Sequence, residues 1–171
     1  VSAVNVSQRV VDVVDRADAE LELTRIGSTY LISAIRERQA AGDRVPIAGE
    51  NNGGVLVPDY RIARDGAYTA VRFCELLGDR TASEAVAPFD GYTTVRRDLA
   101  YDDETHRSAM LQAIAAAAKT ADADRYETDG IRLDFGDGWV LARPSGTEPV
   151  VRVYAEARGA DRANELADWL A

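Results

Sequence analysis

The sequence predicts an α/β fold in two parts: a parallel α/β layer, followed by a small α+β sandwich. In residues 1–80, short apolar stretches of strand type alternate with helical patterns, and this order is typical of a parallel sheet. After residue 91 the order changes to a strand, a helix, several strands and a last helix. Apolar residues make up 46% of the 171 positions, which is enough to form a packed core.

In the first part, four short stretches read as strands: residues 1–6, 21–24, 45–48 and 55–57. Three helices are expected to begin at residues whose side-chain oxygen can accept a backbone N–H, namely Ser7, Ser28 and Asp65. Gly78 is expected to end the third of these helices. The only cysteine, Cys74, lies among apolar residues of that helix, and we expect it to be buried by packing rather than reactive.

In the second part, residues 83–87 read as a short helical piece within a connection. The expected strands are residues 92–99, 131–135, 139–142 and 150–156, with a turn at Gly136–Gly138 between the second and third. Asp103 is expected to cap a helix that ends near Ala118. The last helix begins near Asp161 and presents one apolar face, formed by Ala163, Leu166, Ala167 and Leu170.

The composition narrows the class of protein. The formal net charge of −9 and the pI of about 4.6 argue against nucleic acid and anionic membranes as partners. No secretion signal opens the chain, and no apolar run approaches the length of a membrane span, so a cytoplasmic location is expected. Of 20 basic residues only Lys119 is a lysine, which is typical of halophilic, salt-adapted proteins; a codon bias favouring arginine is the alternative.

The stretch R-P-S-G-T-E-P at residues 143–149 carries the clearest chemistry. Arg143 closes one expected strand, and the prolines at both ends stiffen the loop that follows. Ser145, Gly146 and Thr147 offer hydroxyls and consecutive amides, which can form an anion-binding nest, while Arg143 and Arg152 can each offer a guanidinium to phosphate. From the residues alone, a phosphate site and a tight turn whose arginine pairs with a nearby acid are equally good interpretations.

A second polar loop, G-E-N-N-G-G, spans residues 49–54. Glu50 can accept hydrogen bonds from two sugar hydroxyls, and Asn52 can both donate and accept. Taken alone, such a stretch is more often a surface turn. Arg25 follows another expected strand, within T-R-I-G, and could face the same cleft; an exposed structural arginine is the alternative.

Together these strings resemble the α-D-phosphohexomutases, a family that includes phosphoglucomutase, phosphomannomutase and phosphoglucosamine mutase. The resemblance implies that Arg143, Ser145, Gly146, Thr147 and Arg152 bind the phosphate that is not transferred. It also implies that Glu50 and Asn52 bind the sugar, with Arg25 as a possible residue of the cleft. Arg25 stands where the family often has lysine. The asparagine at position 52 favours a phosphoglucomutase/phosphomannomutase type, while phosphoglucosamine mutase stays open.

The resemblance covers only the C-terminal portion of the family. Residues 1–80 correspond to the end of its third domain, residues 81–91 to a linker, and residues 92–171 to its fourth domain, which is TBP-like. The family's phosphoserine loop, T-A-S-H-N-P, and its magnesium loop, D-x-D-x-D-R, are absent, so we expect neither a catalytic residue nor a metal ligand here.

The resemblance therefore implies an isomerase, an intramolecular phosphotransferase of carbohydrate metabolism, in which this chain is the binding part. The full enzyme would be a phosphoprotein with N-terminal domains, Mg²⁺ and glucose or mannose 1,6-bisphosphate as primer, acting on hexose phosphates. Alone, the chain is expected to be inactive. A stand-alone, non-catalytic module that binds phosphosugars is the alternative.

Overall fold

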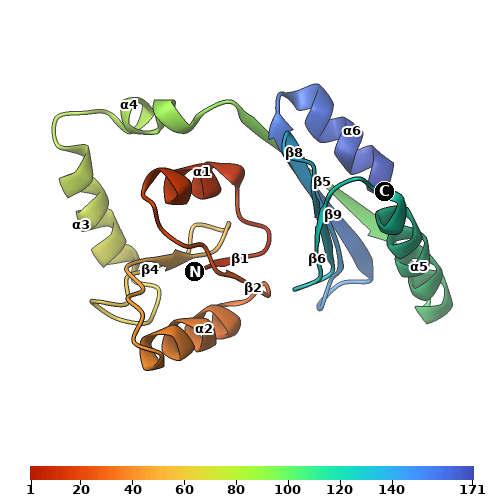
Figure 1. The fold of residues 1–171 in the computed structure, drawn as a ribbon, viewed down its shortest axis with the longest axis horizontal. Helices are drawn as coiled ribbons and strands as arrows, with labels where there is room; N and C mark the ends of the chain where they lie inside the picture. The colour runs from red at the N-terminus through yellow and green to blue at the C-terminus, as the bar shows by residue number, and fades with distance from the viewer. The chain divides into compact units, whose positions relative to one another are not determined.

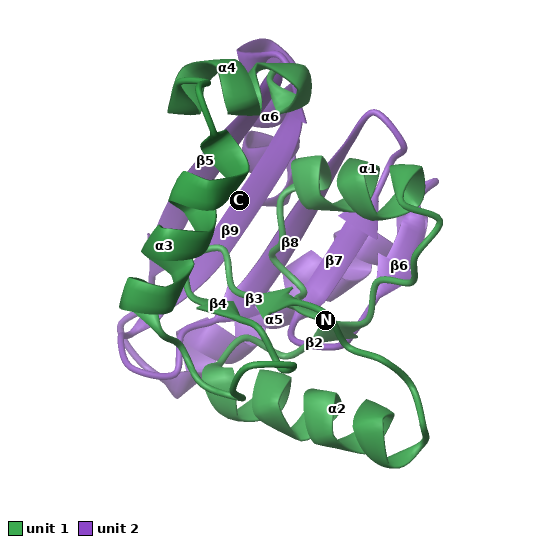
Figure 2. Ribbon diagram, turned by 90° about the vertical axis from the view of Figure 1, so that its left-hand side faces the viewer, with its two compact units in different colours: residues 1–90 green, residues 91–171 purple.

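A computed structural model describes all residues from Val1 to Ala171. The chain forms two compact units, residues 1–90 and residues 91–171, which are coloured separately in Figure 2. Each unit has its own sheet and its own apolar core. None of the helices is long and apolar enough to cross a membrane.

The first unit contains a four-stranded sheet in the order β2-β1-β3-β4. Its strands are β1 (Ser2–Ala3), β2 (Leu23–Thr24), β3 (Ala48–Gly49) and β4 (Val55–Leu56). β1 runs parallel to both β2 and β3, as predicted for this half, while β3 and β4 are antiparallel and are joined by the loop at residues 49–54. Each strand is only two residues long, and the stretch at 45–48 enters the sheet only at its last residue.

Three longer helices accompany this sheet: α1 (Gln8–Arg16), α2 (Ser28–Ala40) and α3 (Gly66–Leu77) (Figure 1). The predicted caps of the first and third are confirmed, because Ser7 accepts from the Arg9 amide and Asp65 accepts from the Tyr68 amide. The prediction for Ser28 was wrong. The amide of Tyr30 already donates to the carbonyl of Gly27, so the helix begins one residue earlier and Ser28 is its first member.

The core of this unit is small and centres on α2 and the sheet. Its buried members are Ala3, Leu31, Ile35, Val45, Ala48 and Leu56. α3 contributes no buried residue, and Cys74 on it is exposed. The expectation of a buried cysteine was therefore wrong: its apolar neighbours Val71 and Phe73 are 61% and 44% exposed, so no packed layer surrounds the thiol.

The segment expected to be a connection is largely helical. α4 (Ala82–Val86) begins with a capping box, in which Thr81 and Glu84 satisfy each other's backbone amides. A short 3₁₀ helix, η1 (Ala87–Phe89), follows directly. Both elements belong to the first compact unit, which ends at Asp90.

The second unit is a five-stranded antiparallel sheet in the order β5-β9-β8-β7-β6. Its strands are β5 (Tyr92–Ala100), β6 (Asp124–Tyr126), β7 (Ile131–Asp134), β8 (Gly138–Pro144) and β9 (Val150–Arg158). Four of them match predicted strands, and the turn between β7 and β8 lies at the predicted glycines. β6 was not predicted, because its residues are polar and exposed and lack the apolar alternation of a half-buried strand.

Two helices, α5 (Glu104–Thr120) and α6 (Ala160–Leu170), cover one face of this sheet (Figure 1). Asp103 caps α5 by accepting from the His106 amide, as predicted. The predicted apolar face of α6 is confirmed, since all four of its members are buried. On the strands, Val140, Ala142, Val151 and Val153 enter this core, so the alternate residues point to the face without helices.

Candidate functional site

The hairpin of β8 and β9 positions the two arginines of the R-P-S-G-T-E-P loop. Arg143 lies directly opposite Arg152 in the antiparallel register. Their neighbours Ala142 and Val153 are buried in the helix-covered core, so both guanidinium groups lie on the opposite face of the sheet. Two cations side by side repel each other, and such a pair needs anions close by.

The loop between these strands has some of its polar groups engaged and others open. The Ser145 amide donates to the carbonyl of Val150 at 2.9 Å. The Ser145 hydroxyl accepts from the amides of Thr147 and Glu148, at 3.4 and 3.2 Å. The Gly146 amide and the Thr147 hydroxyl make no hydrogen bond within the protein, and both residues are exposed. An incoming anion would therefore find one free amide and one free hydroxyl on a loop that is already shaped.

Both arginines also have acidic partners. The Nε of Arg143 lies 3.1 Å from a carboxylate oxygen of Asp129, and Arg152 pairs with Glu148. Paired arginines are what the tight-turn interpretation requires, and free donors are what the phosphate interpretation requires. The structure contains both features, and they are compatible, because each guanidinium carries five N–H groups.

The second loop, at residues 49–54, closes the hairpin of β3 and β4. The Glu50 amide donates to the carbonyl of Gly54 at 3.0 Å, and the side chain of Asn52 accepts from the Gly54 amide at 3.1 Å. The Asn52 amide group also lies 3.3 Å from a carboxylate oxygen of Glu50. The two residues expected to bind sugar thus lie together, and part of their hydrogen-bonding capacity maintains the loop.

Arg64, which the sequence analysis did not single out, forms an ion pair with Glu50. The side chain of Glu50 is only 6% exposed, while that of Arg64 is 43% exposed. The signal in the sequence was available, because Arg64 immediately precedes Asp65, the residue recognised as a cap. Asp129, the partner of Arg143, was also missed, although an Asp-Gly pair directly before a strand is a recognisable pattern.

Arg25 and Glu50 are brought to one edge of the first sheet. Arg25 directly follows β2, and Glu50 directly follows β3. Both strands are parallel to β1, so the two residues lie beyond the carboxyl ends of parallel strands, where α/β sheets usually bind ligands. Arg25 is exposed, and its guanidinium carbon lies 5.0 Å from the centre of the Tyr30 ring.

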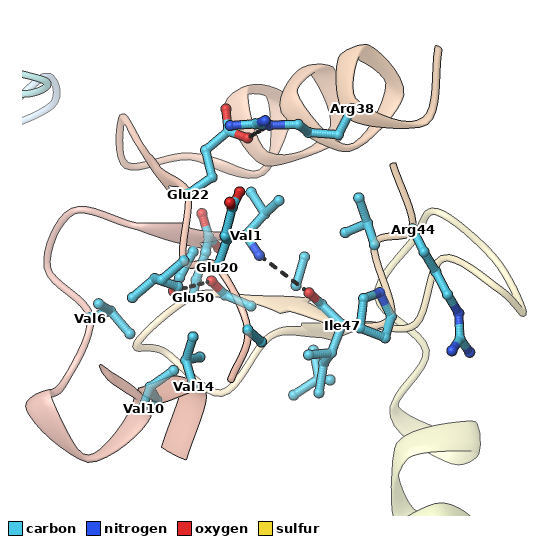
Figure 3. A pocket seen from close by; sticks show the side chains of 18 of the residues that line it. Val1, Val6, Val10, Val14, Glu20, Glu22, Arg38, Arg44, Ile47 and Glu50 are labelled. Carbon is cyan, nitrogen blue, oxygen red and sulfur yellow. Dashed lines mark hydrogen bonds and ion pairs between the residues drawn. The ribbon is translucent and has the colours of Figure 1, made fainter. Parts of the chain in front are cut away.

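A hollow of about 770 Å³ lies in the first unit (Figure 3). Its walls are mainly apolar and include Val6, Val10, Val14 and Ile47, while Glu22 and Arg38 pair with each other at its rim. Glu50 also lines this hollow, so a carboxylate that can accept hydrogen bonds from sugar hydroxyls stands among its apolar walls. A second hollow, of about 600 Å³, is lined by Asn52 and Arg64, among others. Its lining is more polar than that of the first hollow.

No group of three or more histidine, cysteine, aspartate or glutamate side chains that could hold a metal ion occurs in the structure. The residues present therefore do not fit a magnesium site.

Comparison with protein families assigns both units. Residues 1–92 match the model for the phosphoglucomutase/phosphomannomutase alpha/beta/alpha domain III, and residues 99–171 match the model for the C-terminal domain of the same family. This chain belongs to the α-D-phosphohexomutase family. The fold class and the family resemblance predicted from the sequence are thus confirmed.

Named relatives agree with this assignment. The phosphohexomutase chain is 35% identical to a probable phosphoglucosamine mutase of Methanopyrus kandleri over 97% of its own length and 36% of the relative's. It is 30% identical to a phosphoglucomutase/phosphomannomutase of Thermococcus kodakarensis, over 96% of its length and 35% of the relative's. The chain therefore spans about a third of the length of these curated relatives.

Solved structures show the same fold. A crystal structure of a phosphoglucomutase/phosphomannomutase family protein from Burkholderia thailandensis superposes on 98% of the phosphohexomutase chain with a TM-score of 0.79 and 26% identity, and the match covers 35% of that protein. An N-acetylphosphoglucosamine mutase from Aspergillus fumigatus was solved with GlcNAc-6P and magnesium. The match covers 99% of the phosphohexomutase chain and 37% of the Aspergillus chain, with a TM-score of 0.67 and 17% identity.

Proposed function

We propose that this chain is the substrate-binding C-terminal part of a sugar phosphomutase that interconverts hexose 1-phosphate and hexose 6-phosphate. The observation that carries the proposal is the register pair of Arg143 and Arg152 beside a loop with a free Gly146 amide and a free Thr147 hydroxyl. Two guanidinium groups and a neighbouring amide and hydroxyl match the charge and the acceptor oxygens of a phosphate dianion.

In this proposal each loop has a separate task. The loop at residues 143–149 binds the phosphate that is not transferred, using Arg143, Arg152, Ser145, Gly146 and Thr147. The loop at residues 49–54 binds the sugar, with Glu50 accepting from hydroxyls and Asn52 donating or accepting. Arg25 faces the same edge of the sheet as Glu50 and would supply a further positive charge to the cleft.

The preferred sugar is proposed to be glucose or mannose. Arg64 already neutralises the Glu50 carboxylate and would repel an ammonium group beside it. Phosphoglucosamine is the second candidate, because the Methanopyrus relative, at 35% identity, is named as a probable phosphoglucosamine mutase.

The reacting groups are proposed to lie in N-terminal domains outside this chain. Two solved relatives from Aspergillus are described as complexes with magnesium and with glucose 1,6-bisphosphate, respectively. By analogy, the complete protein would use a phosphoserine, Mg²⁺ and a hexose bisphosphate primer. A cytoplasmic, salt-adapted origin belongs to the same proposal and rests on the composition.

Isothermal titration of the chain with glucose, mannose and glucosamine 6-phosphates tests the binding role, with unphosphorylated glucose as the control. We expect saturable binding of the phosphosugars and none of glucose. Equal heats with glucose and its phosphate would contradict the phosphate loop. In a separate assay with Mg²⁺ and a bisphosphate primer, the chain alone is expected to produce no glucose 6-phosphate from glucose 1-phosphate.

A further inference from the structure

We propose that Asp129 is a positioning residue for the phosphate loop: it holds the guanidinium of Arg143 by the Nε edge and leaves both terminal nitrogens for the phosphate. The inference deepens the proposed function and rests on it. It assigns a role to a carboxylate that lies next to a proposed anion site, where a negative charge would otherwise be unfavourable.

The first support is the geometry of the pair. A carboxylate oxygen of Asp129 lies 3.1 Å from Nε of Arg143, and the terminal nitrogens of Arg143 make no hydrogen bond within the protein. Nε itself is buried and not aligned for a hydrogen bond, so the contact is an ion pair made at one edge of the guanidinium. The edge formed by the two terminal nitrogens can present two parallel N–H groups to phosphate oxygens while Nε stays beside Asp129.

Burial gives this pair more influence than the other arginine pair of the loop. The side chains of Arg143 and Asp129 are 15% and 10% exposed, whereas Glu148, the partner of Arg152, is 56% exposed. A buried pair is screened little by water and salt, and removing one member leaves an uncompensated charge. Asp129 therefore restrains Arg143 before ligand arrives, while Glu148 can move away.

Gly130 fixes where the carboxylate lies. A Cβ built on Gly130 would lie 2.2 Å from the carbonyl oxygen of Ala142 and 2.7 Å from Cβ of Arg143, and its φ is +80°. Only glycine allows the backbone to run so close to the end of β8 in this conformation. The close approach brings the backbone at Asp129 beside Arg143, so that a short carboxylate side chain reaches the guanidinium.

The register of the sheet explains why such a restraint is needed. Arg143 and Arg152 are direct cross-strand neighbours, and like charges in that arrangement repel each other. With Asp129 present, Arg143 stays beside Arg152 and both point toward one anion. Without it, the guanidinium of Arg143 would swing away from its neighbour.

The test compares Asp129→Ala, which removes the carboxylate, with Asp129→Asn, which keeps the shape of the side chain but removes the charge of the ion pair. Each is titrated with mannose 6-phosphate in the wild-type and the Arg143→Ala background. Asp137→Ala serves as the matched control, because Asp137 pairs with Arg162 away from the loop. We expect both substitutions to weaken binding by about tenfold, and Asp129→Ala to change nothing further once Arg143 is absent.

Loss of a carboxylate near an anion site would, by charge alone, strengthen phosphate binding, so weaker binding by a variant that still folds supports the positioning role. Unchanged or tighter binding by Asp129→Ala would overturn the inference, as would an equal loss in the Arg143→Ala background. If Arg143→Ala itself binds as the wild type does, the proposed phosphate loop fails, which is a different result from failure of Asp129 alone.

The inference is also open to a measurement without ligand. Nitrogen-15 NMR of arginine side chains reports the Nε–H of Arg143, assigned with Arg143→Lys. This signal is expected to shift in Asp129→Asn and to stay in place in Asp137→Asn. An unmoved signal would overturn the inference even if Asp129→Ala did not fold.

Discussion

The guanidinium of Arg64 lies over Gly54 and pairs with the carboxylate of Glu50, fourteen residues earlier in the chain. A Cβ on Gly54 would lie 2.7 Å from Nε and 2.9 Å from Cδ of Arg64, so the ion pair depends on the missing side chain at that position. The proposed sugar-binding carboxylate is thus held by a cation whose path is left open by a glycine of the loop.

Gly54→Ala is therefore expected to act as Arg64→Ala does. The added methyl would displace the end of a flexible side chain rather than the backbone, so the fold should survive while the Glu50 pair is lost. Both variants should bind mannose 6-phosphate about three- to tenfold more weakly, because Arg64 would no longer hold the Glu50 carboxylate in place for the sugar. This loss is comparable to that of one hydrogen bond. Titration calorimetry measures this directly.

Gly66→Ala is the control for that substitution, because a Cβ there would meet no atom within 4 Å. It should bind as the wild type does. If Gly54→Ala binds with wild-type affinity while Arg64→Ala binds more weakly, then Arg64 does not need the space over Gly54 for its effect on binding.

A second prediction concerns acid stability. The backbone amide of Tyr68, and next the side chain of Arg61, hold the pKa of Asp65 below its ordinary value of 3.8. A depressed pKa means that the charged form stabilises the fold above the pKa of the unfolded chain, and that this contribution is lost as pH falls through the folded pKa. Asp65→Asn keeps a cap but does not titrate.

The melting temperature of the wild type should therefore exceed that of Asp65→Asn near pH 6, and the difference should shrink as pH falls below about 4. Thermal unfolding followed by circular dichroism across this range measures it. A difference that stays constant down to about pH 2 would show that charge on Asp65 is not the cause.

The sequence was sufficient where structure depends on local chemistry. Ser7, Asp65 and Asp103 cap their helices as predicted, because an N-cap needs only a side-chain oxygen and the next few amides. The apolar face of α6 was likewise readable from its spacing. The family strings at residues 49–54 and 143–149 were sufficient to recognise the phosphohexomutases.

The sequence could not predict contacts between residues that only a turn of the chain brings together. Arg64 meets Glu50, and Asp129 meets Arg143, only because a hairpin or a glycine-dependent turn brings them together. Cys74 shows the same limit for packing: its neighbours are apolar, but apolar neighbours along a helix do not establish that another element covers them.

A third prediction follows from the charge. The formal net charge of −9 should destabilise the compact state by self-repulsion, and salt screens that repulsion. The melting temperature should rise markedly as potassium chloride is raised from about 0.1 M to about 2 M. A flat response would instead favour codon bias as the origin of the arginine excess.

The most direct test of the account is amide NMR of the phosphate loop. As mannose 6-phosphate is added to the chain, the free amide of Gly146 is predicted to shift saturably, together with that of Thr147, while mannose without phosphate leaves both in place. Saturable shifts confined to other residues, or no shift at Gly146 at concentrations where binding is complete, would contradict the assignment of this loop to phosphate.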